Sequence, residues 1–217
     1  MRDLWVRAGL LAEGRTDYRF LLPLLDRLLI DLLARHFPGR HNHETPLGIG
    51  AEAAAGPRGA SQIADAIAEH WDECNLFVVH SDGAGDPDRE RANNITPGLL
   101  AAEEWAWEAG KHEPVLVAAC VPVRETEAWM LADLGAFKAL LRSYAPASLP
   151  DDPERVLDPK RELKGLLGDR RRPLDPYDFF GVNITLDALR RLPAFLRFEA
   201  ELLAAVHVLA NPGAPRA

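Results

Sequence analysis

The stretch Gly9–Asp17, with the sequence GLLAEGRTD, constrains the fold of this chain more than any other. An apolar run ends in the acidic residue Glu13, and a glycine follows it. Thr16 can cap a helix that starts at Asp17, because a threonine oxygen accepts hydrogen bonds from the free N–H groups of a first helical turn. We therefore expect a buried strand, a tight turn and a helix, with a carboxylate at the C-terminal end of the strand. In an open α/β sheet, this end of the strand is where ligands bind.

Two later stretches repeat the pattern of an apolar run followed by acidic residues. Leu76–His80 leads to Asp82, and Val115–Val121 leads to Glu125 and Glu127. Since helical patterns separate these runs, they predict an α/β fold with a mostly parallel central sheet and helices on both faces. The C-terminal ends of parallel strands share one edge, so we expect these carboxylates to lie beside that of the first strand.

The remaining patterns divide the chain into two parts. The expected elements of the first part are a strand over Leu4–Ala12, a helix from Asp17 to Leu33, a loop over 36–60 with a short strand at Leu47–Ile49, a helix from Ser61 to about Glu73, a polar loop from Asp82 to Asn94, a helix from Thr96 to near Gly110, and helical structure from Glu127 to Tyr144. The second part is expected to hold a linker over 145–159, a helix from Lys160 to Leu167, an aromatic loop with Tyr177, Phe179 and Phe180, and a helix pair at Leu186–Leu192 and Ala194–Leu209. We therefore expect an α/β core over 1–144 and a linker with a helical C-terminal extension, packed on the core, over 145–217.

Charge and cysteine content exclude several classes of protein. The net charge of −8 lies within residues 1–150, whereas residues 151–217 are neutral. An acidic protein does not attract nucleic acid as a whole, because phosphate neutralisation drives that binding. Two cysteines, Cys74 and Cys120, exclude a disulfide framework and a four-cysteine zinc site. We find no N-terminal targeting segment and no apolar run long enough to span a bilayer, and we therefore expect a cytoplasmic protein that does not enter membranes.

A group of carboxylates at one sheet edge predicts a metal site. Like charges repel one another unless a cation lies among them. Hard oxygen ligands without cysteine favour Mg²⁺ or Mn²⁺ over Zn²⁺, and such ions activate water in phosphodiester hydrolysis. The candidate metal ligands are Glu13, Asp82, Glu125 and Glu127, with Asp86 as an additional ligand from the loop after Asp82.

Each of these residues also has a purely structural explanation. A glutamate near a helix start, such as Glu13, is common without any chemistry. Asp82 followed by a glycine is typical of a simple turn. Glu125 and Glu127 can stabilise a helix N-terminus through the helix dipole. The position of these residues after three strands favours the metal site over separate explanations.

Five motifs follow one another along the chain. EGRTD at 13–17 follows a strand, and the turn at Asp82 follows a second strand. PVRETEAW at 122–129, DPK at 158–160 and LPAF at 192–195 come after them. The first two motifs resemble the Toprim domain of topoisomerases, bacterial primases and nucleases of the OLD (overcoming lysogenization defect) type. More narrowly, the whole set is similar to small bacterial Toprim-like proteins of uncharacterised function that are often encoded near ATPases in defence loci, and this resemblance covers nearly the whole chain.

This resemblance implies a Toprim-like fold and roles for individual residues. Glu13 would be the general base or a metal ligand, and Asp82 and Glu127 would be metal ligands. Lys160 would be a catalytic lysine that stabilises phosphate charge, with an exposed lysine at a helix start as the alternative. The chain departs from the family pattern at one position, because the second acidic motif is usually Asp-x-Asp or Asp-x-Glu and Ala84 occupies its third place.

Two functions follow from these observations, and the first is enzymatic. It is a Mg²⁺- or Mn²⁺-dependent phosphodiesterase, a nuclease acting on DNA or RNA in bacterial anti-phage defence. Four arginines would then contact nucleic acid, namely Arg124 and the consecutive residues Arg170, Arg171 and Arg172. A charge run such as this one is also typical of a solvated surface.

The alternative is a non-catalytic Toprim-like module that docks a partner ATPase. Ala84 and the acidic net charge favour this alternative. Two tryptophans, at 105 and 107, favour it as well, because residues two positions apart cannot share a helix face. We therefore expect the two rings to have different surroundings, with at least one of them exposed or at an interface.

Overall fold

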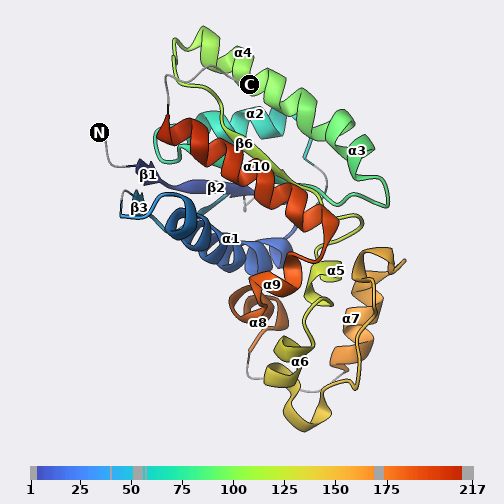
Figure 1. Ribbon diagram of the computed structural model, residues 1–217. Coiled ribbons are helices and arrows are strands. Elements are labelled where there is room, and N and C mark those ends of the chain that lie inside the picture. The colour runs from blue at the N-terminus through green and yellow to red at the C-terminus, as the bar shows by residue number, and fades with distance from the viewer. Residues whose placement is uncertain (1–3, 40, 51–55, 57, 169–173, 212–217) are drawn as a thin grey trace.

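Figure 1 shows a computed structural model of the protein, which describes residues 4–39, 41–50, 56, 58–168 and 174–211. A four-stranded parallel sheet with the strand order β4-β2-β5-β6 lies between two layers of helices. Its strands are β2 (Ala8–Leu11), β4 (Leu47–Ile49), β5 (Leu76–His80) and β6 (Val117–Cys120). This architecture confirms the predicted α/β class with a parallel sheet that is covered on both faces.

The predicted strand over Leu4–Ala12 is divided at Arg7. Its first part is β1 (Leu4–Val6), which pairs in parallel with β3 (His41–His43), a segment that the sequence predicts to be a loop. The Asn75 side chain spans the division: it accepts a hydrogen bond from the Arg7 backbone N–H at 3.0 Å and donates one to the Trp5 carbonyl oxygen at 2.6 Å. These contacts satisfy backbone groups that regular strand pairing would otherwise use.

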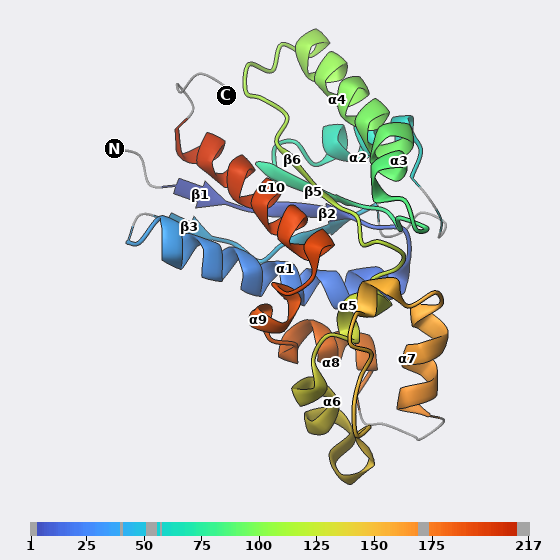
Figure 2. The same cartoon turned by 45° about the vertical axis from the view of Figure 1, so that its right-hand side comes forward.

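Two pairs of helices cover the sheet, one pair on each face (Figures 1 and 2). The helices are α1 (Arg15–His36) with α10 (Pro193–Ala210), and α2 (Ala60–Glu69) with α4 (Thr96–Glu108). Side chains of β5 alternate between the two resulting cores, with Leu76 and Val78 on the α1 and α10 side and Phe77 and Val79 on the other. All five residues of β5 are buried, as expected for a parallel strand between two helical layers.

Helix α1 begins at Arg15, earlier than predicted. Gly14, rather than Thr16, is the N-cap residue, and it has an extended backbone conformation. Asp17 occupies the third helical position, where its carboxylate accepts a hydrogen bond from the Gly14 backbone N–H at 3.1 Å. Within the described residues, neither α1 nor another helix has the length and apolar character that a bilayer-spanning helix needs.

The predicted polar loop from Asp82 to Asn94 is wrong over its second half. Helix α3 (Pro87–Glu90) continues through a π-helical turn (Arg91–Ile95) into α4. The π turn changes the hydrogen-bond register just before Pro97, which has no N–H to donate to a regular helix. The sequence does not predict this helix, because its polar side chains lie on a partly exposed surface and do not form a regular amphipathic pattern.

Shorter helices gather at one end of the molecule, below α1 in Figures 1 and 2. They are α5 (Glu127–Met130), α6 (Leu134–Leu141), α7 (Pro159–Leu167), α8 (Pro176–Asn183) and α9 (Leu186–Leu189), with 3₁₀ turns at Arg142–Tyr144 and Pro153–Arg155. The predicted aromatic loop is therefore wrong, since Tyr177, Phe179 and Phe180 lie in α8. One hydrophobic cluster contains side chains from both sides of residue 145, such as Leu28 and Phe198.

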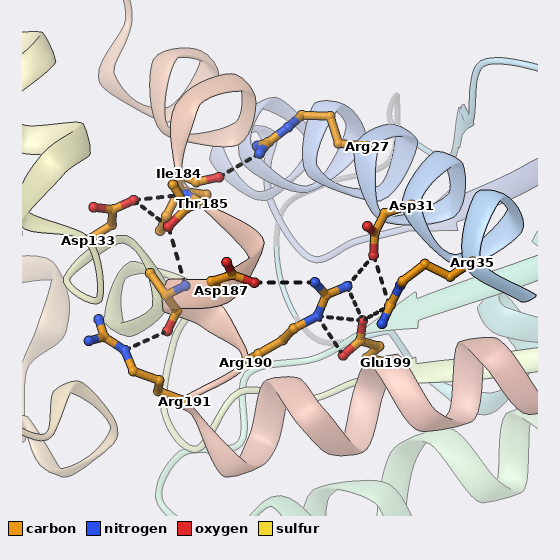
Figure 3. Close-up of polar contacts among 11 residues, drawn as sticks. Arg27, Asp31, Arg35, Asp133, Ile184, Thr185, Asp187, Arg190, Arg191 and Glu199 are labelled. Carbon is orange, nitrogen blue, oxygen red and sulfur yellow. Dashed lines mark hydrogen bonds and ion pairs between the residues drawn. The ribbon is translucent and has the colours of Figure 1, made fainter.

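A network of arginines and carboxylates joins the C-terminal helices to α1 (Figure 3). Arg190, in the turn between α9 and α10, forms ion pairs with Asp31 of α1 and with Glu199 of α10. Arg35 of α1 contacts the same two carboxylates at 2.8 and 3.1 Å. The four side chains fix the position of α10 relative to α1 on this face of the sheet.

Candidate functional site

The strand order reverses between β2 and β5, which is where an open α/β sheet forms its ligand crevice. The chain passes from β2 to β4 on one side, and then to β5 on the other side of β2. Glu13 follows β2, and Asp82 follows β5. The Asp82 backbone N–H donates a hydrogen bond to Glu13 Oε1 at 3.3 Å. Two of the predicted site residues therefore lie side by side at this reversal point.

Ser81 connects Glu13 to the helical segment that the sequence predicts to be a loop. Its Oγ lies 2.5 Å from Glu13 Oε1 and 2.6 Å from Glu90 Oε1, and Asn94 donates to the same Glu90 oxygen at 2.5 Å. A hydroxyl has one proton to donate, so both short contacts are hydrogen bonds only if one of the two carboxyls also carries a proton. Burial raises the pKa of Glu13, and this effect exceeds the opposite effects of Ser81 and His80.

His80, the last residue of β5, is fully buried beneath these carboxylates. Its Nε2 atom lies 3.4 Å from Asp82 Oδ1. Burial lowers the pKa of the imidazole, but the carboxylates of Asp82, Asp17 and Glu13 together raise it by more. The net direction is upward, so the surroundings favour a cationic ring that balances part of the negative charge at this edge.

Glu125 and Glu127 follow β6 and lie in different environments. Glu127 is 2% exposed, and its Oε1 atom accepts a hydrogen bond from the Tyr177 hydroxyl at 2.8 Å. Burial raises the pKa of Glu125, the charges of Glu127 and Asp82 raise it further, and Lys160 opposes them. The charge of Asp82, after β5, thus contributes to the raised pKa of Glu125, after β6.

Lys160 reaches this acidic group from the C-terminal part of the chain. It is the second residue of α7, after the N-cap residue Asp158 and Pro159. Its Nζ lies 3.6 Å from Glu127 Oε1, and its side chain is 61% exposed. The charge of Glu127 is the largest cause of the raised pKa of Lys160. An exposed cation is thus held at the rim of the site.

The turns after β5 and β6 are packed closely against each other. The Gly83 and Gly85 backbone N–H groups donate hydrogen bonds to the carbonyl oxygens of Pro122 and Val123, at 3.2 and 2.7 Å. A Cβ atom at Gly83 would lie 2.3 Å from the Pro122 carbonyl oxygen. Only glycine fits at this position, and its absence of a side chain lets the turn that carries Asp82 approach the turn after β6.

Sequence reasoning missed Tyr177, which contacts Glu127, and the pair Asp17 and Thr126, which links the start of α1 to the segment after β6. Asp17 and Thr126 are buried and share a hydrogen bond of 2.8 Å, while Tyr177 contacts Glu127 from α8. The motif at 13–17 includes Asp17. An aspartate is common at the start of a helix, so the sequence offers no reason to expect a tertiary contact for it. Tyr177 had no such signal, because it lay in a predicted loop.

Two predicted site residues, Asp86 and Arg124, lie in or beside the turn after β5, as does Ala84. Their surroundings differ from those of the carboxylates described above. Asp86 is exposed and acts as the N-cap of α3, where it accepts a hydrogen bond from the Arg89 backbone N–H at 3.1 Å. Asp86 Oδ1 thus caps the start of a helix, and its role as a metal ligand stays a prediction. Ala84 is also exposed and has a φ of 47°. The Arg124 guanidinium lies beside Gly85, within 3.7 Å of the position of a Cβ atom there.

The predicted nucleic-acid contacts of the C-terminal part of the chain cannot be placed at the site. Arg170, Arg171 and Arg172 all lie outside the described residues, between the end of α7 and the start of α8. Among the described residues of the C-terminal part, Lys160 does reach a carboxylate of the acidic group, at 3.6 Å from Glu127 Oε1.

The carboxylate oxygens of Asp82, Glu125 and Glu127 are ligands that suit a hard divalent cation. They do not converge on a single position in this structure. Within the described residues, Glu125 Oε2 is buried without a hydrogen-bond donor, and the buried Asp82 Oδ1 faces His80 Nε2 at 3.4 Å. Glu127 adds a third carboxylate that raises the pKa of Glu125. Within the part of the chain that the structure describes, however, no three His, Cys, Asp or Glu side chains converge closely enough to hold a metal ion. Rotation of these side chains would be needed to bring their oxygens onto one cation.

Comparisons with protein-family models, with curated proteins and with solved structures find no match to this chain. The site combines Glu13 and Asp82 at the reversal point of a parallel sheet with the buried Glu127 and an exposed lysine at its rim.

Proposed function

We propose that the protein is a Mg²⁺- or Mn²⁺-dependent phosphodiesterase, a nuclease of the Toprim/OLD type, that acts at the C-terminal ends of β2, β5 and β6. The observation that carries this proposal is the meeting of Glu13 and Asp82 where the strand order reverses, joined by a hydrogen bond of 3.3 Å. Ligand sites in open α/β sheets lie at this point. Carboxylates there are suited to a reaction that needs a cation and a proton acceptor.

The carboxylates after β5 and β6 support a cation in this reaction. Asp82, Glu125 and Glu127 would hold the ion, since they supply hard oxygen ligands and Glu125 Oε2 is buried without a hydrogen-bond donor among the described residues. A bound divalent cation would lower the pKa of a water molecule and neutralise charge on a phosphate. Without a cation, Lys160 opposes the repulsion from Glu127 and Asp82 that raises the pKa of Glu125, and His80 lies beside Asp82.

The other residues have roles that follow from their positions. Glu13 would accept or hold a proton at Oε1, beside the Ser81 hydroxyl at 2.5 Å. The exposed ammonium of Lys160 would contact a phosphate oxygen. Arg124, beside Gly85, would add a second phosphate contact. These cations and the resemblance to the Toprim family support DNA or RNA as the substrate and anti-phage defence as its setting.

A cleavage assay tests this proposal. Purified protein is incubated with single- and double-stranded DNA and RNA in Mn²⁺, Mg²⁺ or EDTA, beside Asp82→Asn and Glu13→Gln. We expect metal-dependent cleavage that both substitutions abolish while the circular dichroism spectrum is unchanged. Asp65→Asn and Glu104→Gln, at exposed helical positions, are the matched controls and should cleave normally. Cleavage that survives both site substitutions would exclude the proposed site.

A second candidate function is a docking module for a partner ATPase, and the surface of α4 favours it. Trp107 is 84% exposed and Leu100 is 61% exposed, and these positions lie on the same side of the helix. Trp105 instead packs on Trp71, with ring centroids 5.6 Å apart. The prediction that the tryptophans at 105 and 107 have different surroundings is confirmed.

Thermal unfolding with and without Mn²⁺ distinguishes the two functions. A ligand that binds the folded state raises its stability. The nuclease should be stabilised by Mn²⁺, and Asp82→Asn should remove the effect. A docking module need not respond to the metal, and substitution of Trp107 should then impair binding of the ATPase instead.

A further inference from the structure

Helix α8 reaches the acidic edge through a single side chain. The Tyr177 hydroxyl donates a hydrogen bond to Glu127 Oε1 at 2.8 Å, and Lys160 Nζ lies 3.6 Å from the same oxygen. Glu127 is only 2% exposed, so water has little access to orient its carboxylate. An ionised carboxylate only accepts hydrogen bonds, so the Tyr177 hydroxyl is the donor in this contact.

The backbone around Tyr177 is itself held in place. Asp175 is the N-cap residue of α8 and accepts a hydrogen bond from the Tyr177 backbone N–H at 2.9 Å. The same aspartate forms an ion pair of 2.6 Å with Arg19 of α1. The first turn of α8 is therefore anchored to α1 close to the position from which Tyr177 extends.

The other end of α8 is in unusually close contact with α1. A Cβ atom at Gly181 would lie 2.4 Å from the Phe20 carbonyl oxygen and 2.5 Å from Pro23 Cγ. Arg27 of α1 donates a hydrogen bond to the Gly181 carbonyl oxygen at 2.9 Å and another to that of Ile184 at 2.7 Å. Only glycine permits this approach, and it sets the distance between α8 and the helix that begins beside Glu13.

Building on the proposed function, we infer that Tyr177 is a positioning residue whose hydroxyl orients the Glu127 carboxylate for cation binding, and that α8 is locked onto α1 to hold it there. A hydrogen bond from a neighbouring side chain fixes the orientation of a ligating carboxylate, and its loss typically weakens metal affinity or activity about 10- to 100-fold. The C-terminal part of the chain thus contributes two groups to one Glu127 oxygen: an exposed cation from α7 and a neutral donor from α8.

Tyr177→Phe removes the hydroxyl and keeps the ring, so it tests the contact directly. Mn²⁺ is titrated into metal-free protein and the melting temperature is followed. We expect the Mn²⁺ concentration for half-maximal stabilisation to rise about 10-fold or more, with a circular dichroism spectrum like that of the wild type. In the cleavage assay at saturating Mn²⁺, kcat should fall while KM for the nucleic acid is unchanged. Tyr144→Phe, at an exposed tyrosine, is the matched control and should match the wild type in both readouts.

Gly181→Ala tests the role of the helix contact without altering the site. The added Cβ atom pushes α8 away from α1 and should weaken the response to Mn²⁺ in the same direction as Tyr177→Phe. If both changes act through the Tyr177 hydroxyl, the double variant should be no worse in Mn²⁺ affinity than the more affected single variant. Gly165→Ala, at a position in α7 where no atom of the described residues lies within 4 Å of the added Cβ, is the control.

The outcomes separate this inference from the proposed function. Wild-type affinity for Mn²⁺ and wild-type kcat in Tyr177→Phe would overturn the inference, even if Asp82→Asn is inactive as expected. A wild-type protein that neither responds to Mn²⁺ nor cleaves nucleic acid would overturn the proposed function, and this inference with it.

Discussion

Thr126 and Asp17, which are 109 positions apart, form a buried hydrogen bond of 2.8 Å between Oγ1 and Oδ1. The other carboxylate oxygen of Asp17 accepts a hydrogen bond from the Gly14 backbone N–H at 3.1 Å. One aspartate therefore ties the turn after β2, which carries Glu13, to the turn after β6, which carries Glu127. This link fixes the relative position of two of the three acidic turns at the sheet edge.

Replacing Thr126 by valine keeps the shape of the side chain and removes the donor. The buried Asp17 carboxylate then loses a hydrogen-bond partner, and we expect the free energy of unfolding to fall by about 1–3 kcal/mol. Urea denaturation measures this change. Thr126→Ser retains the hydroxyl and should recover most of the loss, whereas equal unfolding curves for Thr126→Val and the wild type would show that the bond adds no stability.

The raised pKa of Glu13 predicts that metal-free protein loses stability as the pH rises. The folded state retains this proton to a higher pH than the unfolded chain, whose ordinary value is 4.5. The cost of ionising Glu13 is therefore absent below about pH 4.5, and it is fully present above the raised pKa. Glu13→Gln should be more stable than the wild type near neutral pH, and the difference should vanish towards acid pH.

Metal-free thermal melts over this pH range measure the effect, with Glu104→Gln as the exposed control. A difference in melting temperature that grows towards acid pH would contradict the assigned direction of the Glu13 pKa shift.

Gly83→Ala should disrupt the packing between the turns after β5 and β6. The new Cβ atom would lie 2.3 Å from the Pro122 carbonyl oxygen and 2.8 Å from that of Val123, and both are backbone atoms. Overpacking of this kind costs about 1–3 kcal/mol, and we expect the melting temperature to fall accordingly. Gly165→Ala, inside α7, should instead gain about 0.5–1 kcal/mol because alanine is the better helix former.

Arg190→Ala should destabilise the contact between α1 and α10 that is drawn in Figure 3. Its removal leaves Asp31 and Glu199 with Arg35, whose own side chain is 46% exposed. We expect a loss of about 1–2 kcal/mol in urea denaturation, and a smaller loss at high salt. Arg155→Ala is the matched control, since its pair with Asp152 is exposed and should contribute less than about 1 kcal/mol. Equal losses for the two variants would exclude a special role for the network.

The sequence by itself determined which residues follow the strands and which class of sheet those strands form. The apolar run at 76–80 is long enough to be buried on both faces, and β5 occupies those residues. Glu13, Asp82 and Glu125 follow apolar runs within a few positions, and parallel strands bring such positions to one edge. These predictions depend on local periodicity and on turn residues, which act within a few positions of the chain.

Only the tertiary structure decided how the acidic residues are supported. Thr126 reaches Asp17 over 109 positions, and Tyr177 reaches Glu127 over 50. Such contacts depend on how helices pack against each other. The local sequence pattern around Gly181 therefore does not predict the close approach of α8 to α1. The same reason explains the incorrect loop predictions at Asp82–Asn94 and around Tyr177. These segments are short or polar, and they are helical because neighbouring elements satisfy their side chains rather than because of their own periodicity.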